Sequence, residues 1–177
     1  NAARKLPAAR LAAVAFPTTT SMITRLTVRN FKRFDEAVIP LGAPVVFVGP
    51  NNSGKTTALQ ALALWELGLR TWMEKRGSGS TAKQRVGVVL NRRDLVQLPV
   101  STTALLWRDK HLRQAPNTGA KATQNILLQI TVEGVSEGVA WSCPLDFDYS
   151  NDEIIHCRPS WLEPHSDKGA PVPPEAQ

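Results

Sequence analysis

The sequence predicts an α/β fold with a mixed sheet, one long helix that follows a glycine-rich loop, and an antiparallel β-hairpin or meander. Residues 49–56 form a glycine-rich stretch between a short apolar run and a helical pattern. Over residues 59–73, apolar side chains recur every three or four positions, as they do on one face of a helix. Over residues 126–133 and 139–148, apolar and polar side chains alternate, which is typical of paired strands with one buried face.

Length and composition predict one globular domain. A chain of 177 residues with 42% apolar and 20% charged residues is ordinary for a soluble protein. No apolar run approaches the roughly 18 residues that a membrane span requires, so we expect no membrane partner. Cys143 and Cys157 stand without a CxxC pair, which indicates buried or free thiols of a reducing compartment, although adjacent strands could bring them together.

The two ends of the chain differ in composition from the part between them. Residues 1–21 carry three basic and no acidic residues, and their apolar stretch is too short for a secretory signal. We interpret this segment as a disordered leader or an upstream artefact, and we expect a cytoplasmic protein. The domain is therefore expected over residues 22–160, and the proline-rich residues 161–177 are expected to form a tail.

The first elements can be assigned in chain order. Alternation from residue 22 predicts a strand that ends near Asn30, and residues 37–41 predict a second strand. Between them, residues 31–34 form a basic and aromatic turn. Val45 to Val48 is a continuous apolar run, which predicts a buried strand that leads into the glycine-rich loop.

The remaining elements are predicted from the spacing of apolar residues and from a candidate helix cap. A helix is expected from about Gly54 to Lys75, with an apolar stripe at Leu59, Leu62, Trp65, Leu69, Trp72 and Met73. Residues 86–90 predict a short strand, and Ser101 is a candidate N-cap for a helix that would carry Ala104, Leu105, Trp107 and Leu112. Residues 153–157 predict a third strand beside the hairpin.

Residues 49–56 read Gly-Pro-Asn-Asn-Ser-Gly-Lys-Thr and fit the phosphate-loop pattern G-x-x-x-x-G-K-[ST], the Walker A motif. Glycines at both ends allow the backbone to curl, so that successive N–H groups point toward phosphate oxygens. The helix that follows adds its free N-terminal amides and the positive end of its dipole. The residues expected to bind nucleotide are Gly49, Asn51, Asn52, Ser53, Gly54, Lys55, Thr56 and Thr57.

Two side chains of this loop have specific expected roles. Lys55 is expected to reach the β- and γ-phosphates, and the Thr56 hydroxyl is expected to ligate Mg²⁺. The alternative is a turn rich in Gly and Asn with a solvated lysine. The apolar run before the loop and the helical pattern after it favour the nucleotide site.

Basic residues are concentrated in the first two thirds of the chain. Nineteen Lys and Arg residues stand against six Asp and Glu through residue 121, whereas the remainder has two against nine. Ten of the basic residues lie between Lys75 and Lys121. Such a stretch could neutralise DNA phosphates, and a solvated helix face with loops explains it equally well.

The order strand, Asn30-Phe31-Lys32-Arg33-Phe34, strand and phosphate loop resembles the N-terminal lobe of ABC-type ATPases of the RecF/SMC group. The double Asn of the loop is similar in particular to the OLD-type branch and its AAA-family relatives in DNA repair and phage defence. The resemblance covers residues 22–75 and is only architectural over residues 124–158.

The resemblance implies cofactors, partners and further site residues. ATP and Mg²⁺ are the implied cofactors, and Lys32 or Arg33 is implied to lie near nucleotide or DNA. Gln97 is implied as a metal-contacting glutamine, although its surroundings match poorly and a loop amide is the alternative. ATP-bound heads of such proteins form homodimers, which implies a homodimer for the full-length protein.

The chain also departs from this group. Hydrolysis needs an apolar strand that ends in Asp-Glu, and Asp152-Glu153 follows polar residues instead, so we interpret it as a turn. The serine-glycine signature is missing as well, so the chain resembles the front portion of a longer protein, and no catalytic residue is assigned. Three functions stay open: the ATP-binding lobe of a DNA-repair or phage-defence ATPase, an ATPase lobe that regulates an OLD-type nuclease, and a non-hydrolysing nucleotide- or DNA-binding module.

Overall fold

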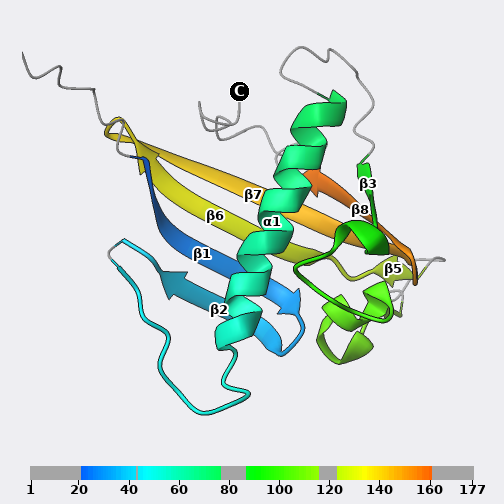
Figure 1. Cartoon of the computed structure of the whole chain (residues 1–177). Coiled ribbons are helices and arrows are strands. Elements are labelled where there is room, and N and C mark those ends of the chain that lie inside the picture. Colours follow the sequence, from blue (N-terminus) through cyan, green and yellow to red (C-terminus); the bar gives the residue numbers. More distant parts are fainter. Residues whose placement is uncertain (1–20, 43, 77–86, 116–122, 161–177) are drawn as a thin grey trace, which may run out of the picture.

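A long helix crosses one face of a six-stranded sheet (Figure 1) in the computed structural model, which describes residues 21–42, 44–76, 87–115 and 123–160. The strands lie in the order β2-β1-β6-β7-β8-β3, and every neighbouring pair is antiparallel. The six strands are β1 (Ser21–Phe31), β2 (Phe34–Pro40), β3 (Val88–Asn91), β6 (Leu128–Ser136), β7 (Val139–Asn151) and β8 (Ile154–Pro159). The α/β class is confirmed, whereas the expected mixed sheet is wrong for the described strands, because none of them runs parallel to its neighbour.

The second half of the sheet confirms the predicted antiparallel meander. β6 and β7 pair from Leu128 opposite Phe147 to Ser136 opposite Val139. Asp152 and Glu153 form the turn before β8, as expected. The side chains of β6 and β7 that face the helix are buried, namely Leu128, Ile130, Val132, Trp141, Cys143, Leu145 and Phe147. Alternation of apolar and polar residues was therefore a reliable guide here.

Helix α1 (Lys55–Arg76) confirms the predicted helix but contacts the sheet through a different face. Its buried residues are Ala58, Ala61, Leu64, Leu67 and Gly68. Of the stripe expected to be buried, Leu59 is 57% exposed, and Trp65 and Trp72 are only partly buried against the core. Ala58, Ala61 and Gly68 let the helix backbone approach the sheet closely, so the tryptophans of the predicted stripe flank the contact instead of filling it.

Gly68 marks a close approach of α1 to the sheet. A Cβ at this position would lie 2.8 Å from Cys157 Sγ and 3.1 Å from carbons of the Phe147 ring. We expect Gly68→Val to lower the free energy of unfolding by roughly 1–3 kcal/mol, because overpacking forces neighbouring groups to move. Urea unfolding followed by circular dichroism measures this change.

Gly42 offers the matched control for that substitution, because a Cβ at Gly42 would meet no atom within 4 Å. Gly42→Val is expected to leave the unfolding midpoint within the small range typical of surface changes. Equal midpoints for the two variants would contradict the close packing of α1 on the sheet.

The strand predicted at Val45 to Val48 is wrong. Residues 44–49 have no regular secondary structure and pair with no described strand. Val46 and Val48 are 81% and 88% exposed. Figure 1 shows this segment leaving the sheet after β2 and returning to the start of α1. A strand requires a neighbour with free backbone groups, and no described strand supplies them here.

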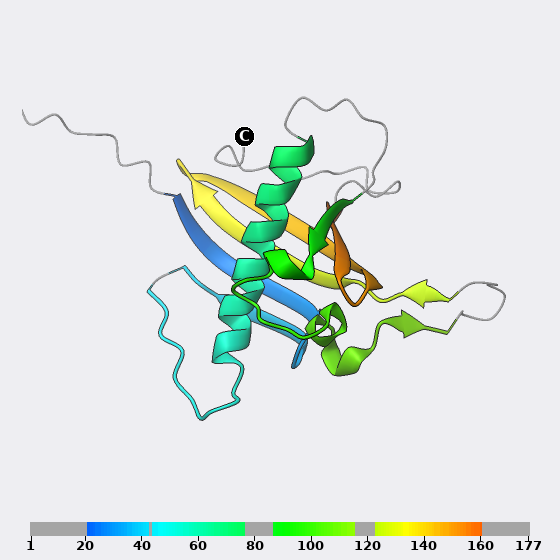
Figure 2. The same ribbon diagram turned by 45° about the vertical axis from the view of Figure 1, so that its right-hand side comes forward.

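The helix predicted from Ser101 to Leu112 is also wrong. The region instead contains short 3₁₀ turns, η2 (Thr103–Leu106) and η3 (Arg108–Lys110), and η1 (Arg92–Asp94) precedes them. Asp109 and Lys110 have left-handed backbones, with φ of 49° and 57°, which no α-helix tolerates. A two-stranded arm of β4 (Arg113–Gln114) and β5 (Gln124–Asn125) follows, and Figure 2 shows it projecting from the sheet.

The structure can be compared with the predictions for the strand near residue 88 and for the two ends of the chain. The short strand expected at 86–90 is present as β3, and residue 86 lies outside the described residues. The expected leader up to residue 20 and the expected tail 161–177 also lie outside them, while Ser21 already belongs to β1. Among the residues that the structure describes, no helix is both long and apolar enough to cross a membrane.

Candidate nucleotide-binding site

The phosphate loop, residues 49–54, curves around the side-chain amine of Lys55. Lys55 Nζ donates hydrogen bonds of 2.7 Å to the carbonyl oxygens of Gly49 and Pro50 and one of 3.3 Å to Ser53 Oγ. Within the loop, Ser53 N donates to Pro50 O at 3.3 Å. Because three loop oxygens converge on one ammonium group, the loop is bent around a common centre and is not extended.

The backbone at the end of the loop leads directly into the helix. Gly54 has a φ of 101° and Asn52 a φ of 67°, conformations that glycine and asparagine adopt most readily. Ala58 N donates to Gly54 O at 2.9 Å, which closes the first turn of α1. The amides of residues 55–57 precede this bond and have no intrahelical acceptor, so they and the helix dipole favour a bound anion.

The turn between β1 and β2 packs against the phosphate loop. Arg33 Nη1 donates to Asn52 Oδ1 at 3.1 Å. A Cβ at Gly54 would lie 2.9 Å from the Phe34 ring, so this ring covers the glycine. Lys32 Nζ reaches Gln60 Oε1 at 2.7 Å, on the second turn of α1. The structure thus brings Arg33 to the loop itself and Lys32 to the side of the helix.

The cations beside the loop have only neutral partners among the described residues. Lys55 contacts carbonyl and hydroxyl oxygens, and Arg33 and Lys32 each contact a side-chain amide oxygen. By contrast, Arg29 and Arg92 pair with glutamates. Burial lowers the pKa of Lys32, because desolvation disfavours the charged form. Because the described partners of Lys55 and Arg33 are neutral, positive charge is in excess at the loop and favours an anionic ligand.

The two residues expected at a metal lie apart. Thr56 is exposed on the first turn of α1. Gln97 lies in an exposed turn and lines, with Ala63 and Leu67, a hollow of about 150 Å³ beside the middle of α1. Ala63 lies seven positions after Thr56 on the helix, which corresponds to a rise of about 10 Å along the helix axis. The structure therefore does not bring Gln97 to the phosphate loop, and the described residues contain no group of three or more His, Cys, Asp or Glu side chains that could hold a metal.

Two residues of the site were not predicted from the sequence. Gln60 is an ordinary polar position on a helix, and its contact with Lys32 depends on how α1 sits on the sheet. Phe34 was part of the basic and aromatic turn, but its contact with Gly54 appears only in three dimensions. The aromatic residue that directly follows a basic pair was the available hint for Phe34.

The cysteines take no part in this site. Cys143 and Cys157 are both free and buried on neighbouring strands, as expected from the sequence. Burial raises the pKa of the Cys143 thiol to about 12 and raises the pKa of the Cys157 thiol as well. Both thiols are therefore protonated and unreactive at neutral pH.

Comparison with known proteins bears on the same part of the chain. Residues 22–66 match the family model of the AAA ATPase domain, and this range contains β1, β2, the phosphate loop and the first half of α1. The chain is 46% identical over 43 residues to an OLD nuclease of Thermus scotoductus, a match that covers 24% of this chain and 8% of that protein. The resemblance to AAA-family ATPases and, distantly, to the OLD type, which the motifs at 30–34 and 49–56 indicated, is thereby confirmed over the start of the domain.

Proposed function

We propose that this chain is the ATP-binding lobe of an ATPase that acts on DNA in repair or phage defence, and that it binds ATP with Mg²⁺ through residues 49–57. The observation that carries the proposal is the loop closed around Lys55 Nζ. Because the partners of this ammonium group are neutral, phosphate oxygens can replace them with stronger, charge-assisted hydrogen bonds. The match of residues 22–66 to the AAA ATPase domain supports the nucleotide class.

Each part of the loop would contribute in a different way. Lys55 would neutralise phosphate charge, and the free amides of residues 55–57 would donate hydrogen bonds at the positive end of the helix. The Thr56 hydroxyl would hold Mg²⁺, which when bound neutralises further phosphate charge. Arg33 would exchange the amide oxygen of Asn52 for the anion.

Isothermal titration calorimetry of the full chain with ATP and Mg²⁺ tests the proposal. We expect saturable binding with one site per chain, and competition by inorganic triphosphate, because the described contacts are all suited to the phosphates. No heat of binding at millimolar ATP would refute it. Phosphate release from the same mixture separates an ATPase from a module that binds nucleotide without turnover.

Thr56→Ala is expected to weaken ATP binding in the presence of Mg²⁺ by roughly tenfold, the loss of about one hydrogen bond to a charged group. With the metal chelated, the loss should be much smaller, because the hydroxyl then has no metal to ligate. Calorimetric titrations with and without EDTA measure both values. Thr71→Ala, a threonine near the other end of α1, serves as the control, and equal losses in both conditions would argue against the metal role of Thr56.

The similarity to an OLD nuclease favours a second candidate, in which this lobe regulates a DNA-cutting domain. Both candidates use the same loop, so nucleotide binding alone does not separate them. Cleavage of duplex DNA by the full-length protein that depends on ATP would favour the nuclease. Steady ATP turnover stimulated by DNA without cleavage would favour the ATPase.

DNA as a partner and a homodimer through the ATP-bound heads belong to the same proposal. Fluorescence anisotropy with a labelled DNA duplex tests the first, and an affinity that falls steeply with salt is expected if the basic residues contact phosphates. Light scattering with and without ATP tests whether the protein forms a homodimer.

A cytoplasmic location is also proposed, and the free thiols Cys143 and Cys157 support a reducing compartment.

A further inference from the structure

The β1–β2 turn, residues 31–34, is attached to two parts of the molecule at once. On one side it contacts the phosphate loop and α1, as described above. On the other side it contacts the 103–110 segment, which contains η2 and η3. Lys32 N donates to Leu106 O at 2.8 Å, and Phe31 forms an antiparallel bridge with Trp107. Asp35, just after the turn, lies 3.5 Å from Arg108. A shift of this turn therefore acts on both neighbours.

The backbone of the turn depends on these contacts. Asn30 and Lys32 are non-glycine residues with φ of 56° and 49°. Left-handed backbone costs a non-glycine residue about 1–2 kcal/mol, and it persists only where surrounding contacts hold it. Asn30 Nδ2 also donates to Leu127 O at 2.9 Å. A turn in this state is sensitive to the gain or loss of a single partner.

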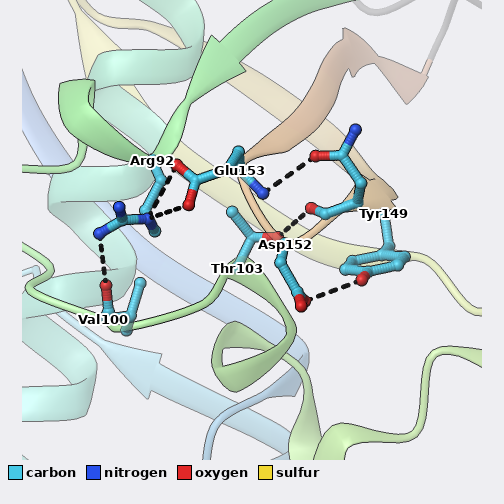
Figure 3. A network of polar contacts seen from close by, with 7 residues as sticks. Arg92, Val100, Thr103, Tyr149, Asp152 and Glu153 are labelled. Carbon is cyan, nitrogen blue, oxygen red and sulfur yellow. Dashed lines mark hydrogen bonds and ion pairs between the residues drawn. The ribbon is translucent and has the colours of Figure 1, made fainter.

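The 103–110 segment is tied in turn to the β7–β8 connection. Thr103 is fully buried, its N–H donates to Asp152 O at 3.0 Å, and its hydroxyl donates to Asn151 O at 2.5 Å. Figure 3 shows Thr103 beside Asp152, whose carboxylate accepts a hydrogen bond from Tyr149. Arg92 joins the same group through Glu153 at 3.0 Å. These contacts hold the segment to the β7–β8 connection at several points.

Trp107 connects the segment to the base of the β4–β5 arm. Its side chain is 1% exposed, and its Nε1 donates to Ile126 O at 2.6 Å. Ile126 N donates to Leu112 O at 2.9 Å, which joins the two chains of the arm at their base. The Trp107 ring also meets Tyr149 edge-on, with 5.8 Å between ring centroids.

We propose that nucleotide binding at the phosphate loop changes the order of the 103–110 segment and of the base of the β4–β5 arm, through the β1–β2 turn. The inference rests on the proposed function, because it needs a phosphate ligand. The Arg33 guanidinium contacts Asn52 of the loop, and a bound phosphate competes for it with a stronger bond. The contact between turn and loop therefore differs between the free and bound states, which is the condition for a ligand to shift a conformation.

Amide hydrogen exchange of the full chain, with and without ATP and Mg²⁺, tests the coupling. We expect slower exchange at residues 49–57 and a change of at least about threefold at Trp107 and Ile126, whose amides donate to Ala104 O and Leu112 O. Protection of the loop with no change at these two amides would overturn the inference and leave the proposed function intact. No protection of the loop would overturn both.

Trp107→Phe sharpens the test, since it keeps a buried ring and removes the indole hydrogen bond to Ile126 O. The loop of this variant should still be protected by ATP, whereas the response of Ile126 should be lost. Trp72→Phe, on a partly buried residue of α1, is the matched control and should keep both responses. An undiminished response of Ile126 in Trp107→Phe would show that the indole does not carry the coupling and would overturn the route proposed here.

Discussion

Lys55→Ala is expected to lower the affinity for ATP by roughly 100-fold, because a charge-assisted contact with phosphate contributes about 3 kcal/mol. The fold should be unaffected, since the side chain contacts only the exposed loop oxygens of Gly49, Pro50 and Ser53. Calorimetry measures the affinity, and thermal unfolding measures the stability. The expected signature is thus a large loss of binding with a melting temperature close to that of the parent.

Lys75→Ala provides the matched control for this change. Lys75 lies in the last turn of the same helix, and its Nζ donates to Val89 O at 3.2 Å. The same charge is removed, but far from the loop, so ATP affinity should stay within about twofold of the parent. Equal affinities for Lys55→Ala and Lys75→Ala would disprove the role of Lys55. A much lower melting temperature of Lys55→Ala would show that the lysine side chain stabilises the fold.

Trp107→Ala is expected to lower the free energy of unfolding by roughly 3–5 kcal/mol, the usual range for a large aromatic side chain removed from a core. The indole is among the largest fully buried side chains, and it loses its hydrogen bond to Ile126 O together with its edge-on contact with Tyr149. Equilibrium unfolding in urea measures the change. A small domain has about 5–15 kcal/mol of stability in total, so this variant should lose a large fraction of its stability.

The Phe variant at the same position separates packing from hydrogen bonding. Trp107→Phe keeps most of the buried ring, so we expect a loss of about 1–2 kcal/mol, dominated by the unsatisfied carbonyl of Ile126. Comparable losses for the Ala and Phe variants would mean that the hydrogen bond, and not the packing, dominates. A loss below about 1 kcal/mol for Trp107→Ala would contradict the central position of this side chain in the core.

The parts of the fold that the sequence predicted well are those set by local patterns. The bend of residues 49–54 follows from local spacing, because glycines at fixed positions need no distant partner, and phosphate binding by this loop stays a prediction. The hairpin of β6 and β7 follows from strict alternation, since the two strands are consecutive in the chain and are joined by a tight turn. Helix α1 follows from its period, although the period did not reveal which side meets the sheet.

The parts that were wrong depend on tertiary contacts. The side of α1 that meets the sheet is chosen by Ala58, Ala61 and Gly68, whose lack of bulk matters more than apolar character. The 103–110 segment carries apolar residues at helical spacing, but its local backbone bonds are of the 3₁₀ type, and Leu106 O and Thr103 N bond to the β1–β2 turn and the β7–β8 connection. At the site itself, the sequence indicated the loop and Arg33, while the contact of Gln60 with Lys32 required the packed helix.

The exposed run at Val45 to Val48 has a consequence for the behaviour of the polypeptide in solution. Its four residues are uncharged and apolar, and Pro44 before the run and Pro50 after it leave it shorter than the roughly six or seven residues of a cross-β segment. Val46 and Val48 face solvent and are absent from the core. An exposed apolar run of this kind favours non-specific association at high protein concentration, while the two flanking prolines limit strand pairing with another chain.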